Sequence, residues 1–377
     1  MEKYIKRSLA PIIEKHLGKG MVIIVYGARQ VGKTTLVKML LEKYGASGGY
    51  LNCDLPEVRR ILETQNHLLI KDYLGANKMV VLDEAQQVRE IGKVLKIMHD
   101  TYPELQIVAT GSSSFDLANK LSEPLTGRSL IFALYPFSIA ELENNFSRFD
   151  LSAKLGDFLV YGQYPAIALA PAADRALLLR NLAGNYLYKD VLMFENLRRS
   201  DLLTDLLKLL ALQIGAEVSM HELAVRLKCN VKTAERYLEL LEKSFVVFRL
   251  RPLARNLRNE IGKKVKVFFY DLGVRNAIID RFADLSLRDD LGALWENFCV
   301  MERMKANQRN ETNSGAYFWR NHAGQEVDYL EDQNGRIAAY EFKWGQGKFR
   351  APKEFLGEYG VKKIEMVNRD NFFNFLI

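Results

Sequence analysis

The chain has 377 residues, of which 48% are hydrophobic and 26% are charged. This is the composition of an ordinary globular protein, and it excludes the disordered, collagen-like and coiled-coil classes. At roughly 150 residues a domain, the length predicts two or three domains. No apolar run reaches the roughly eighteen residues of a membrane span, so we expect none. The basic N-terminus leads into no apolar segment of the kind that a signal peptide needs.

Three cysteines lie far apart in the sequence, which favours neither a disulfide framework nor a metal-binding motif. A reduced, cytoplasmic location is therefore expected. The net charge is +7, but residues 226–275 carry thirteen Lys and Arg against five Asp and Glu, a local excess of +8. We call this segment the basic block. It is typical of a surface that binds a polyanion, although a solvated basic face would have the same composition.

Residues 21–26 form an apolar, β-branched run that predicts a buried parallel strand. The pattern G-x-x-x-x-G-K-T follows directly, and residues 36–44 then read as a helix. This order is typical of a P-loop, whose backbone N–H groups and helix N-terminus bind phosphates. We expect Lys33 to contact the β- and γ-phosphates of ATP and Thr34 to bind Mg²⁺. The candidate nucleotide-binding residues are Gly27, Ala28, Arg29, Gln30, Val31, Gly32, Lys33, Thr34 and Thr35.

A second apolar run, residues 78–82, ends in Asp83 and Glu84. After a P-loop, the first acid is expected to hold Mg²⁺ and the second to polarise the attacking water. The alternative is a strand that ends in two solvated acids. The preceding P-loop favours the catalytic interpretation.

Further short strands are predicted at residues 49–54, 105–111 and 129–134. The chain resembles the AAA+ ATPases in three features. It has a predicted strand between the P-loop and the Asp83-Glu84 motif, a candidate catalytic glutamate, and a strand after that motif that ends in polar residues. The resemblance implies that the polar strand end senses the γ-phosphate, and Thr110 and Ser112 are the candidates. It also makes Arg128 a candidate arginine finger or sensor arginine that acts on ATP in cis or in trans. A loop-anchoring role for this arginine is equally open.

The next two segments are expected to be helical. Residues 137–200 have a helical period and predict the lid of the ATPase. Ser219 and Glu222 have the spacing of a capping box, and Asn230 is placed to cap the helix that follows. Residues 201–275 predict a winged helix-turn-helix, with helices at 201–213, 219–227 and 231–243 and strands at 245–250 and 265–270.

The helix at 231–243 is expected to be the recognition helix, because it is the second helix of the helix-turn-helix. Its candidate contact residues are Lys232, Thr233, Arg236 and Tyr237. The wing is expected to add phosphate contacts from Arg255, Arg258, Lys263 and Lys264. Winged helices also serve as protein-contact modules, and the local charge favours DNA over that alternative.

The last hundred residues contain the hairpin signal Asn334-Gly335. If these two residues form a type I′ turn, Gln333 pairs with Arg336. Counting back along both strands then places Asp328 opposite Glu341, and Glu326 opposite Lys343, all on one face. Carboxylates aligned across strands repel by up to roughly 1 kcal/mol, so a cation between them would stabilise the hairpin.

Asp328 and Glu341-x-Lys343, with Glu296 on the preceding helix, resemble the PD-(D/E)XK nucleases. The resemblance implies that Glu296, Asp328 and Glu341 bind Mg²⁺ or Mn²⁺ and that Lys343 positions or activates the attacking water. Oxygen ligands suit these ions better than Zn²⁺. The alternatives are a salt-bridged surface hairpin and a nuclease fold without activity.

The whole chain resembles a prokaryotic family of predicted AAA+ ATPases whose C-terminal domain is similar to the PD-(D/E)XK nucleases. The resemblance implies an α/β protein with an AAA+ core at 1–136, a helical lid at 137–200, a winged helix at 201–275 and a restriction-endonuclease-like domain at 276–377. We expect an enzyme that hydrolyses ATP, acts on nucleic acid, most simply DNA, and forms a homo-oligomer if Arg128 acts in trans.

The alternative is an ATP-driven switch or sensor, for example in defence, whose nuclease-like domain is an inactive scaffold. A protein-remodelling AAA+ machine is a third hypothesis, and the basic block argues against it. A cleavage assay separates the first two hypotheses.

Overall fold

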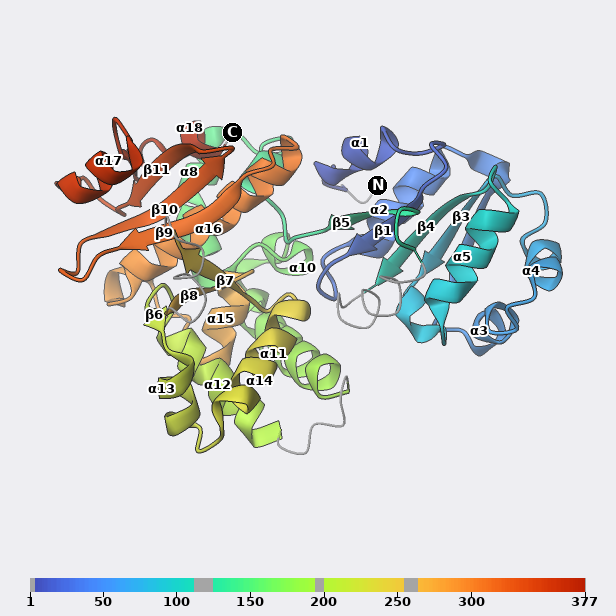
Figure 1. Cartoon of the computed structure of the whole chain (residues 1–377), viewed down its shortest axis with the longest axis horizontal. Helices are drawn as coiled ribbons and strands as arrows, with labels where there is room; N and C mark the ends of the chain where they lie inside the picture. The colour runs from blue at the N-terminus through green and yellow to red at the C-terminus, as the bar shows by residue number, and fades with distance from the viewer. Residues whose placement is uncertain (1–3, 112–124, 194–199, 254–263, 377) are drawn as a thin grey trace. The chain divides into compact units, whose positions relative to one another are not determined.

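The computed structural model describes residues 4–111, 125–193, 200–253 and 264–376 (Figure 1). The sensor candidate Ser112 and the wing residues Arg255, Arg258 and Lys263 lie outside these ranges. The chain divides into two compact units, residues 1–135 with 243–245, and residues 136–242 with 246–377. Among the described helices, none is long and apolar enough to cross a membrane.

The first unit is built on a five-stranded sheet in the order β2-β3-β4-β1-β5, and all its strand pairs are parallel. The apolar runs of β1 and β3 are buried along their whole length, as expected for central parallel strands. The strands are β1 (Val22–Tyr26), β2 (Gly48–Asn52), β3 (Met79–Asp83), β4 (Gln106–Gly111) and β5 (Ser129–Ala133).

The helices of this unit cover the sheet. Side chains of α3 (Pro56–Leu62), α4 (His67–Leu74) and α5 (Ile91–Thr101) share one apolar core with alternate residues of β1, β3 and β4. Helix α2 (Lys33–Glu42) starts directly after the glycine-rich loop and contacts β2, β3 and β4, and α1 (Leu9–Glu14) packs on α2. The carboxyl ends of β1, β3 and β4 therefore meet at one edge, where ligands of open α/β sheets bind.

The second unit opens with five helices. Capping boxes from Ser138 and Glu141 and from Ser147 and Asp150 start α7 and α8. The helices are α7 (Ile139–Leu142), α8 (Arg148–Ala153), α9 (Leu155–Tyr161), α10 (Pro165–Ala168) and α11 (Ala172–Met193).

The helices and strands expected within 201–275 are all present. Ser219 accepts a hydrogen bond from the backbone N–H of Glu222, and Asn230 accepts one from that of Thr233, so both predicted caps form. A short strand that was not predicted, β6, pairs with β8. The elements are α12 (Ser200–Leu212), β6 (Glu217–Val218), α13 (Met220–Arg226), α14 (Val231–Lys243), β7 (Val247–Pro252) and β8 (Val265–Phe269).

One seven-stranded sheet, in the order β12-β11-β10-β9-β7-β8-β6, runs through the second unit. Strand β7 pairs in parallel with β9, so that Arg251 lies opposite Tyr317. The sheet therefore crosses the domain boundary expected at residue 275. The remaining elements are α15 (Leu272–Ile278), α16 (Leu291–Arg309), β9 (Gly315–Arg320), β10 (Glu326–Gln333), β11 (Arg336–Phe342), α17 (Lys353–Tyr359), β12 (Glu365–Val367) and α18 (Phe372–Leu376).

The hairpin β10–β11 has the predicted register. Asn334 and Gly335 have φ values of 54° and 85°, the left-handed backbone that a type I′ turn requires. Gln333 pairs with Arg336, and the ladder is continuous to the pair of Tyr329 and Tyr340. A dipeptide that fixes the turn thus fixes the register of the whole hairpin.

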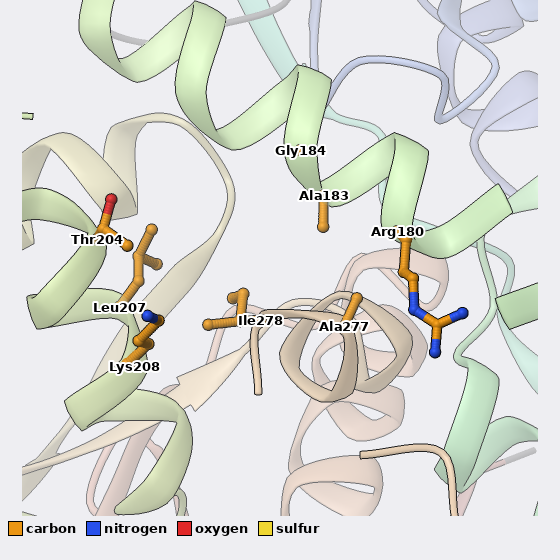
Figure 2. Close-up of a pocket in the computed structure, with 8 residues that line it drawn as sticks. All are labelled: Arg180, Ala183, Gly184, Thr204, Leu207, Lys208, Ala277 and Ile278. Carbon is orange, nitrogen blue, oxygen red and sulfur yellow. The ribbon is translucent and has the colours of Figure 1, made fainter. Parts of the chain in front are cut away.

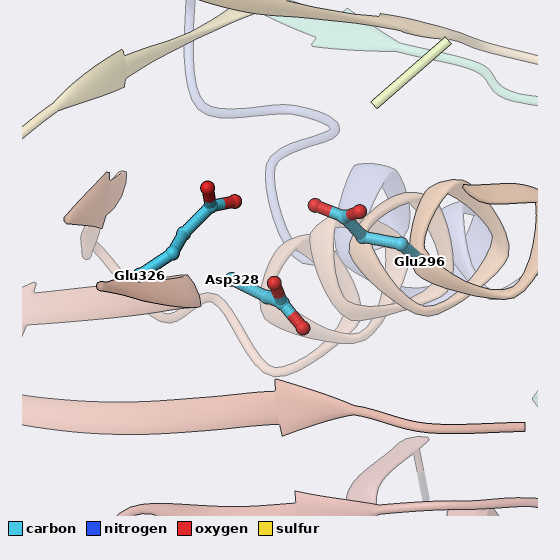
Figure 3. A group of neighbouring side chains, drawn as sticks. All are labelled: Glu296, Glu326 and Asp328. Carbon is cyan, nitrogen blue, oxygen red and sulfur yellow. The ribbon is translucent and has the colours of Figure 1, made fainter. Parts of the chain in front are cut away.

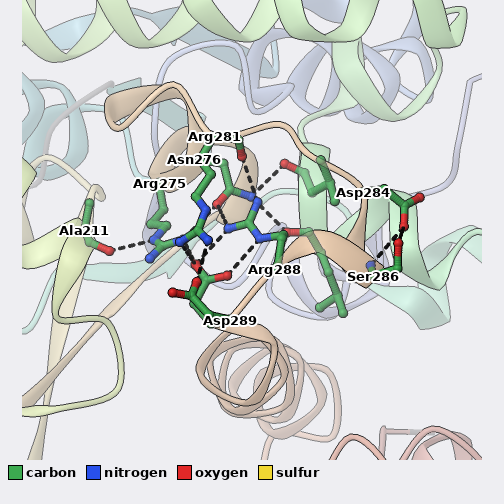
Figure 4. A network of polar contacts seen from close by, with 11 residues as sticks. Ala211, Arg275, Asn276, Arg281, Asp284, Ser286, Arg288 and Asp289 are labelled. Carbon is green, nitrogen blue, oxygen red and sulfur yellow. Dashed lines mark hydrogen bonds and ion pairs between the residues drawn. The ribbon is translucent and has the colours of Figure 1, made fainter.

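A buried polar network holds α16 in place (Figure 4). Arg275 on α15 donates to the carbonyl oxygen of Ala211 at 2.7 Å and to Asp290 at 2.6 Å. Arg288 also donates to both carboxylate oxygens of Asp290, each at 2.8 Å. Asp290 immediately precedes α16, so these contacts fix the start of the helix that carries Glu296.

Candidate functional site

The glycine-rich loop curls between β1 and α2. A side chain at Gly27 would collide with the carbonyl oxygen of Leu134, and Gly32 has a left-handed φ of 99°, so both positions favour glycine. The buried ammonium of Lys33 donates to the carbonyl oxygens of Gly27 and Ala28, at 3.0 Å each. The lysine thus lies within the curl of the loop, where it suits a phosphate group.

Arg7 supports this loop from outside the motif. Its guanidinium is buried and donates to the carbonyl oxygen of Val31 at 2.7 Å and to that of Tyr135. The side chain therefore ties the loop to the chain just after β5. The sequence offers no signal for this contact beyond the basic character of the N-terminus.

Asp83 accepts hydrogen bonds from three hydroxyl groups at the carboxyl edge of the sheet. One carboxylate oxygen accepts from Thr34 at 2.8 Å and from Tyr50 at 2.5 Å, and the other accepts from Thr110 at 2.5 Å. The structure therefore brings together the P-loop threonine, the strand-end aspartate and the expected sensor residue. Tyr50 was missed, although it lies on β2, the strand that pairs with β3. Burial, and next its hydrogen bond to Asp83, raise the pKa of Tyr50.

Glu84 has an unusual backbone conformation for a glutamate. Its φ is 54° and its ψ is 44°, in the left-handed region. Its N–H donates to the hydroxyl of Thr110 at 3.0 Å, and its carboxylate accepts from Gln86 at 2.5 Å. Non-glycine residues are held in this conformation mainly where the surroundings fix them, as at functional sites. Thr110 links Glu84 directly to Asp83.

Arg128 is not brought to the P-loop of its own chain. It immediately precedes β5, whose first residue Ser129 pairs with Val22, whereas the P-loop follows Tyr26. The two ends of these strands are four residues, or about 13 Å, apart. Arg128 instead donates to Asp100 at 2.8 Å. Of the roles left open for Arg128, this placement argues against binding nucleotide in cis, and a role in trans and a loop-anchoring role stay open.

A second group of acids lies in the second unit (Figure 3). Carboxylate oxygens of Glu296, Glu326 and Asp328 lie within 4.8 Å of one another, and we call these residues the carboxylate cluster. The ammonium of Lys266 lies among them, 2.6 Å from Glu296, in contact with Glu326 and 4.0 Å from Asp328. Its side chain is only 2% exposed. Burial opposes this charge, but the three carboxylates outweigh burial and raise the pKa of Lys266.

Glu341 and Asp328 each adjoin the last pair of the hairpin ladder, Tyr329 and Tyr340, so the register continued by one residue would place them opposite each other. One oxygen of Asp328 accepts from the backbone N–H of Phe342 at 2.9 Å, next to Glu341. One oxygen of Glu341 accepts from Lys343 at 2.7 Å. The other, Oε2, is buried and has no hydrogen-bond partner among the described residues. A buried carboxylate oxygen without a donor is costly unless a ligand or cation satisfies it.

The expected contact between Glu326 and Lys343 does not form. Glu326 instead pairs with Lys266 and lies 3.3 Å from Arg320. The reason is local: the ladder with β11 ends at Tyr329, and the register with β9 shifts between Val327 and Leu330. Glu326 therefore lies beyond the regular part of the hairpin.

Burial, and after it the charge of neighbouring acids, raises the pKa values of Glu296 and Glu341. Burial raises the pKa of Glu296 to about 8. Burial and then the charge of Asp328 raise the pKa of Glu341. Burial thus disfavours the charged forms of these acids, and a divalent cation with oxygen ligands would favour them. The free oxygen of Glu341 fits such an ion.

The helix α14 exposes only part of its expected contact surface. Lys232 and Arg236 are exposed, but Tyr237 is 5% exposed and belongs to the apolar face with Ala234 and Leu238. The expectation that Tyr237 contacts a ligand is therefore wrong. Its spacing from these two residues places it on the buried stripe of an amphipathic helix.

A hollow of about 330 Å³ lies between α13, α14 and the strands β7 and β8. Its exposed basic residues are His221, Arg251 and Lys264. Not all of the basic block is available to a ligand, because Lys266 and Arg275 are buried in contacts with carboxylates. The surface charge is accordingly smaller than the composition indicates.

A smaller hollow of about 160 Å³ lies between α11, α12 and α15 (Figure 2). Arg180 and Lys208 line it beside small and apolar side chains, and Arg180 is paired with Asp280 at 2.8 Å. None of the described residues that line it is an acid, so the lining offers no carboxylate ligand for a metal ion.

Comparisons with known proteins divide the chain into three parts. Residues 19–143 match the family described as AAA domain. Residues 152–285 and 291–371 match two families, each described as a domain of unknown function, DUF8612 and DUF4143.

Proteins similar over most of their length occur in distant prokaryotes. An uncharacterized protein of Mycobacterium tuberculosis is 26% identical over 342 residues, which cover 90% of this chain and 74% of the relative. One of Haemophilus influenzae is 23% identical over 277 residues, covering 68% of this chain and 69% of the relative. A solved structure of Drosophila ORC bound to AT-rich DNA and Cdc6 is similar at 11% identity and a TM-score of 0.27, covering 73% of this chain and 90% of that chain.

Proposed function

Because residues 19–143 match the AAA domain family, we propose that this chain binds ATP with Mg²⁺ and hydrolyses it. The observation that carries the proposal is the hydrogen-bonded group of Thr34, Asp83 and Thr110 beside the glycine-rich loop. In P-loop enzymes a threonine hydroxyl and a strand-end aspartate hold the metal that bridges the phosphates. The oxygen donors of Thr34 and Asp83 suit that ion.

The remaining groups have roles that follow from their chemistry. Lys33 supplies a positive charge to the phosphates, which stabilises the charge that develops during transfer. Glu84 is the candidate general base, and its attachment to Gln86 and Thr110 restricts where its carboxylate points. Bound nucleotide would then change the contacts of Asp83 and Thr110 together.

Two substitutions test this proposal. Glu84→Gln removes only the basic carboxylate, so ATP binding should remain while turnover falls by about 10²- to 10⁴-fold. Lys33→Ala should abolish binding of ATP as measured by a fluorescent nucleotide analogue. Glu57→Gln, an exposed substitution on α3, is the matched control. Turnover of the Glu84→Gln protein at the wild-type rate would exclude Glu84 as the base.

The action on nucleic acid is the next part of the proposal. Helices α12, α13 and α14 with strands β7 and β8 have the element order of a winged helix-turn-helix, in which α14 would be the recognition helix. Exposed Lys232 and Arg236 on α14, and Arg251 and Lys264 in the nearby hollow, support phosphate contacts. A protein-contact role is the alternative, and it predicts no dependence of DNA affinity on these cations.

We further propose metal-dependent cleavage of nucleic acid at Asp328, Glu341 and Lys343. The hairpin register and the unpartnered oxygen of Glu341 support it. Lys266 among the carboxylates favours the alternative of an ATP-driven switch with an inactive scaffold, because a fixed ammonium already neutralises part of the cluster.

Nuclease assays with Mg²⁺ or Mn²⁺, with and without ATP, separate these two functions. Wild-type protein should cleave nucleic acid and Glu341→Ala should not, since the substitution removes a metal ligand. Exposed Glu365→Gln on the neighbouring strand β12 is the matched control. Equal cleavage by wild type and Glu341→Ala would show that the cleavage does not come from this site. The ATP-driven switch with an inactive scaffold would then be the remaining function.

A further inference from the structure

Lys266 reaches the carboxylate cluster from a distant part of the sequence. It lies on β8, whereas Glu296 lies on α16 and Glu326 and Asp328 lie on β10. An ammonium has three donors, and here two of the cluster's carboxylates lie within hydrogen-bond reach while Asp328 lies at 4.0 Å. Lys266 thus forms its close ion pairs with Glu296 and Glu326.

The oxygens of the four acids divide into two groups. Glu296 Oε1 and Glu326 Oε1 contact Lys266, and Glu326 Oε2 lies 3.3 Å from Arg320. On the other side, Asp328 Oδ2 is satisfied by a backbone N–H and Glu341 Oε1 by Lys343. Three oxygens remain. Glu296 Oε2 lies beside Gly215. Asp328 Oδ1 and Glu341 Oε2 belong to the residues next to the last hairpin pair, Tyr329 and Tyr340, and Glu341 Oε2 is buried without a partner among the described residues.

We propose that Lys266 is a built-in cation that takes the place of one metal ion, so that this site binds a single divalent cation between Asp328 and Glu341. Glu296 and Glu326 then hold Lys266 and are not ligands of the ion. Two-metal sites place their ions about 3.5 to 4 Å apart on shared carboxylates. Here the ammonium lies 4.0 Å from the Asp328 oxygen proposed to bind the ion, so its charge acts on the same aspartate without a hydrogen bond to it.

The inference deepens the proposed metal-dependent function and rests on it. It also revises the expected ligand set, since Glu296 leaves the set and becomes a positioning residue for Lys266. A further consequence concerns Lys266 itself. Its removal would leave Glu296 and Glu326 without this counter-ion, and their oxygens and one of Asp328 lie within 4.8 Å of one another, which suits a second ion.

The test counts bound Mn²⁺ by electron paramagnetic resonance on the full chain without ATP. All proteins carry Lys33→Ala and Asp83→Asn, which remove the metal expected at the P-loop. We expect one Mn²⁺ per chain in this background, none in Glu341→Gln, and one in Glu296→Gln. We expect two in Lys266→Met, which keeps the length of the side chain but removes the charge.

Folding is controlled by thermal melting, because Lys266→Met leaves buried carboxylates without a counter-ion. The double variant Lys266→Met/Glu296→Gln removes a charge of each sign and should bind one ion, at Asp328 and Glu341. Glu365→Gln is the matched control and should also bind one ion. These variants keep the proposal testable if Lys266→Met does not fold.

The outcomes separate the inference from the function on which it rests. Two ions in the starting protein, or loss of the ion in Glu296→Gln, would overturn the role of Lys266 and leave metal-dependent cleavage intact. No ion in the starting protein would overturn both. A single ion that Glu341→Gln removes and Glu296→Gln keeps is the result that the geometry predicts.

Discussion

Thr110 is the residue whose substitution tests the nucleotide site most directly. Its hydroxyl donates to Asp83 at 2.5 Å and accepts from the N–H of Glu84 at 3.0 Å, and its side chain is fully buried. Thr110→Val keeps the branched shape and removes both hydrogen bonds. The hydroxyl that links Asp83, the proposed metal ligand, to Glu84, the proposed base, is then absent.

The size of the effect follows from the hydrogen bond between Thr110 and the Asp83 carboxylate. A hydrogen bond to a charged group contributes about 1.5–3 kcal/mol. If the hydrogen bond from Thr110 to Asp83 stabilises the transition state but not the bound ATP, its loss raises the activation free energy of hydrolysis by the same amount, about 1.5–3 kcal/mol. Each 1.36 kcal/mol is tenfold in rate, so turnover should fall by about 10- to 150-fold. ATP affinity should change little, since Lys33 and the loop are untouched.

The assay is steady-state ATP hydrolysis combined with equilibrium binding of a fluorescent ATP analogue. Exposed Thr64→Val on the same unit is the control for a threonine-to-valine change, because its hydroxyl donates to the carbonyl oxygen of Ile61, away from the nucleotide site. Wild-type turnover by Thr110→Val would refute the reasoning. A loss of ATP binding as large as the loss of turnover would assign Thr110 to binding instead.

Two further predictions concern charged surfaces. Arg128→Ala should lower ATP turnover and spare ATP binding if the arginine acts on a neighbouring chain. Asp100→Asn, which removes the charge of its partner but leaves the arginine, should leave turnover unchanged, and a fully active monomer would exclude the role in trans. Lys232→Gln with Arg236→Gln should weaken duplex DNA binding and reduce the slope of log K against log salt by about one for each phosphate that is no longer neutralised. Lys19→Gln, an exposed charge change in the first unit, should leave that slope unchanged.

The parts of the structure that the sequence predicted best are those set by short-range geometry. The turn at Asn334-Gly335 determines the register of β10 and β11, and the order of strand, loop and helix determines the position of Lys33. In both cases one local conformation fixes its neighbours by the fixed repeat of a strand or helix.

The parts that were missed depend on pairing between distant segments. Lys266 was counted as one cation of the basic block, and only the pairing of β8 with β7 brings it to acids on α16 and β10. Tyr50 and Arg7 likewise reach the nucleotide site from strands and loops outside the motifs. Tyr237 is different, because the helical period around it already indicated a buried position.

The pairing of β7 with β9 bears on how this chain can be divided, by experiment or by recombination. A fragment that begins at residue 276 would expose an edge of β9 that β7 normally covers, and it would leave the acids of β10 without the ammonium of Lys266. The segment proposed to read DNA and the segment proposed to cut it share strand β8 as a common part. A chimera that takes either segment from a relative would therefore need a β8 that pairs with β7 and also presents Lys266 to the acids.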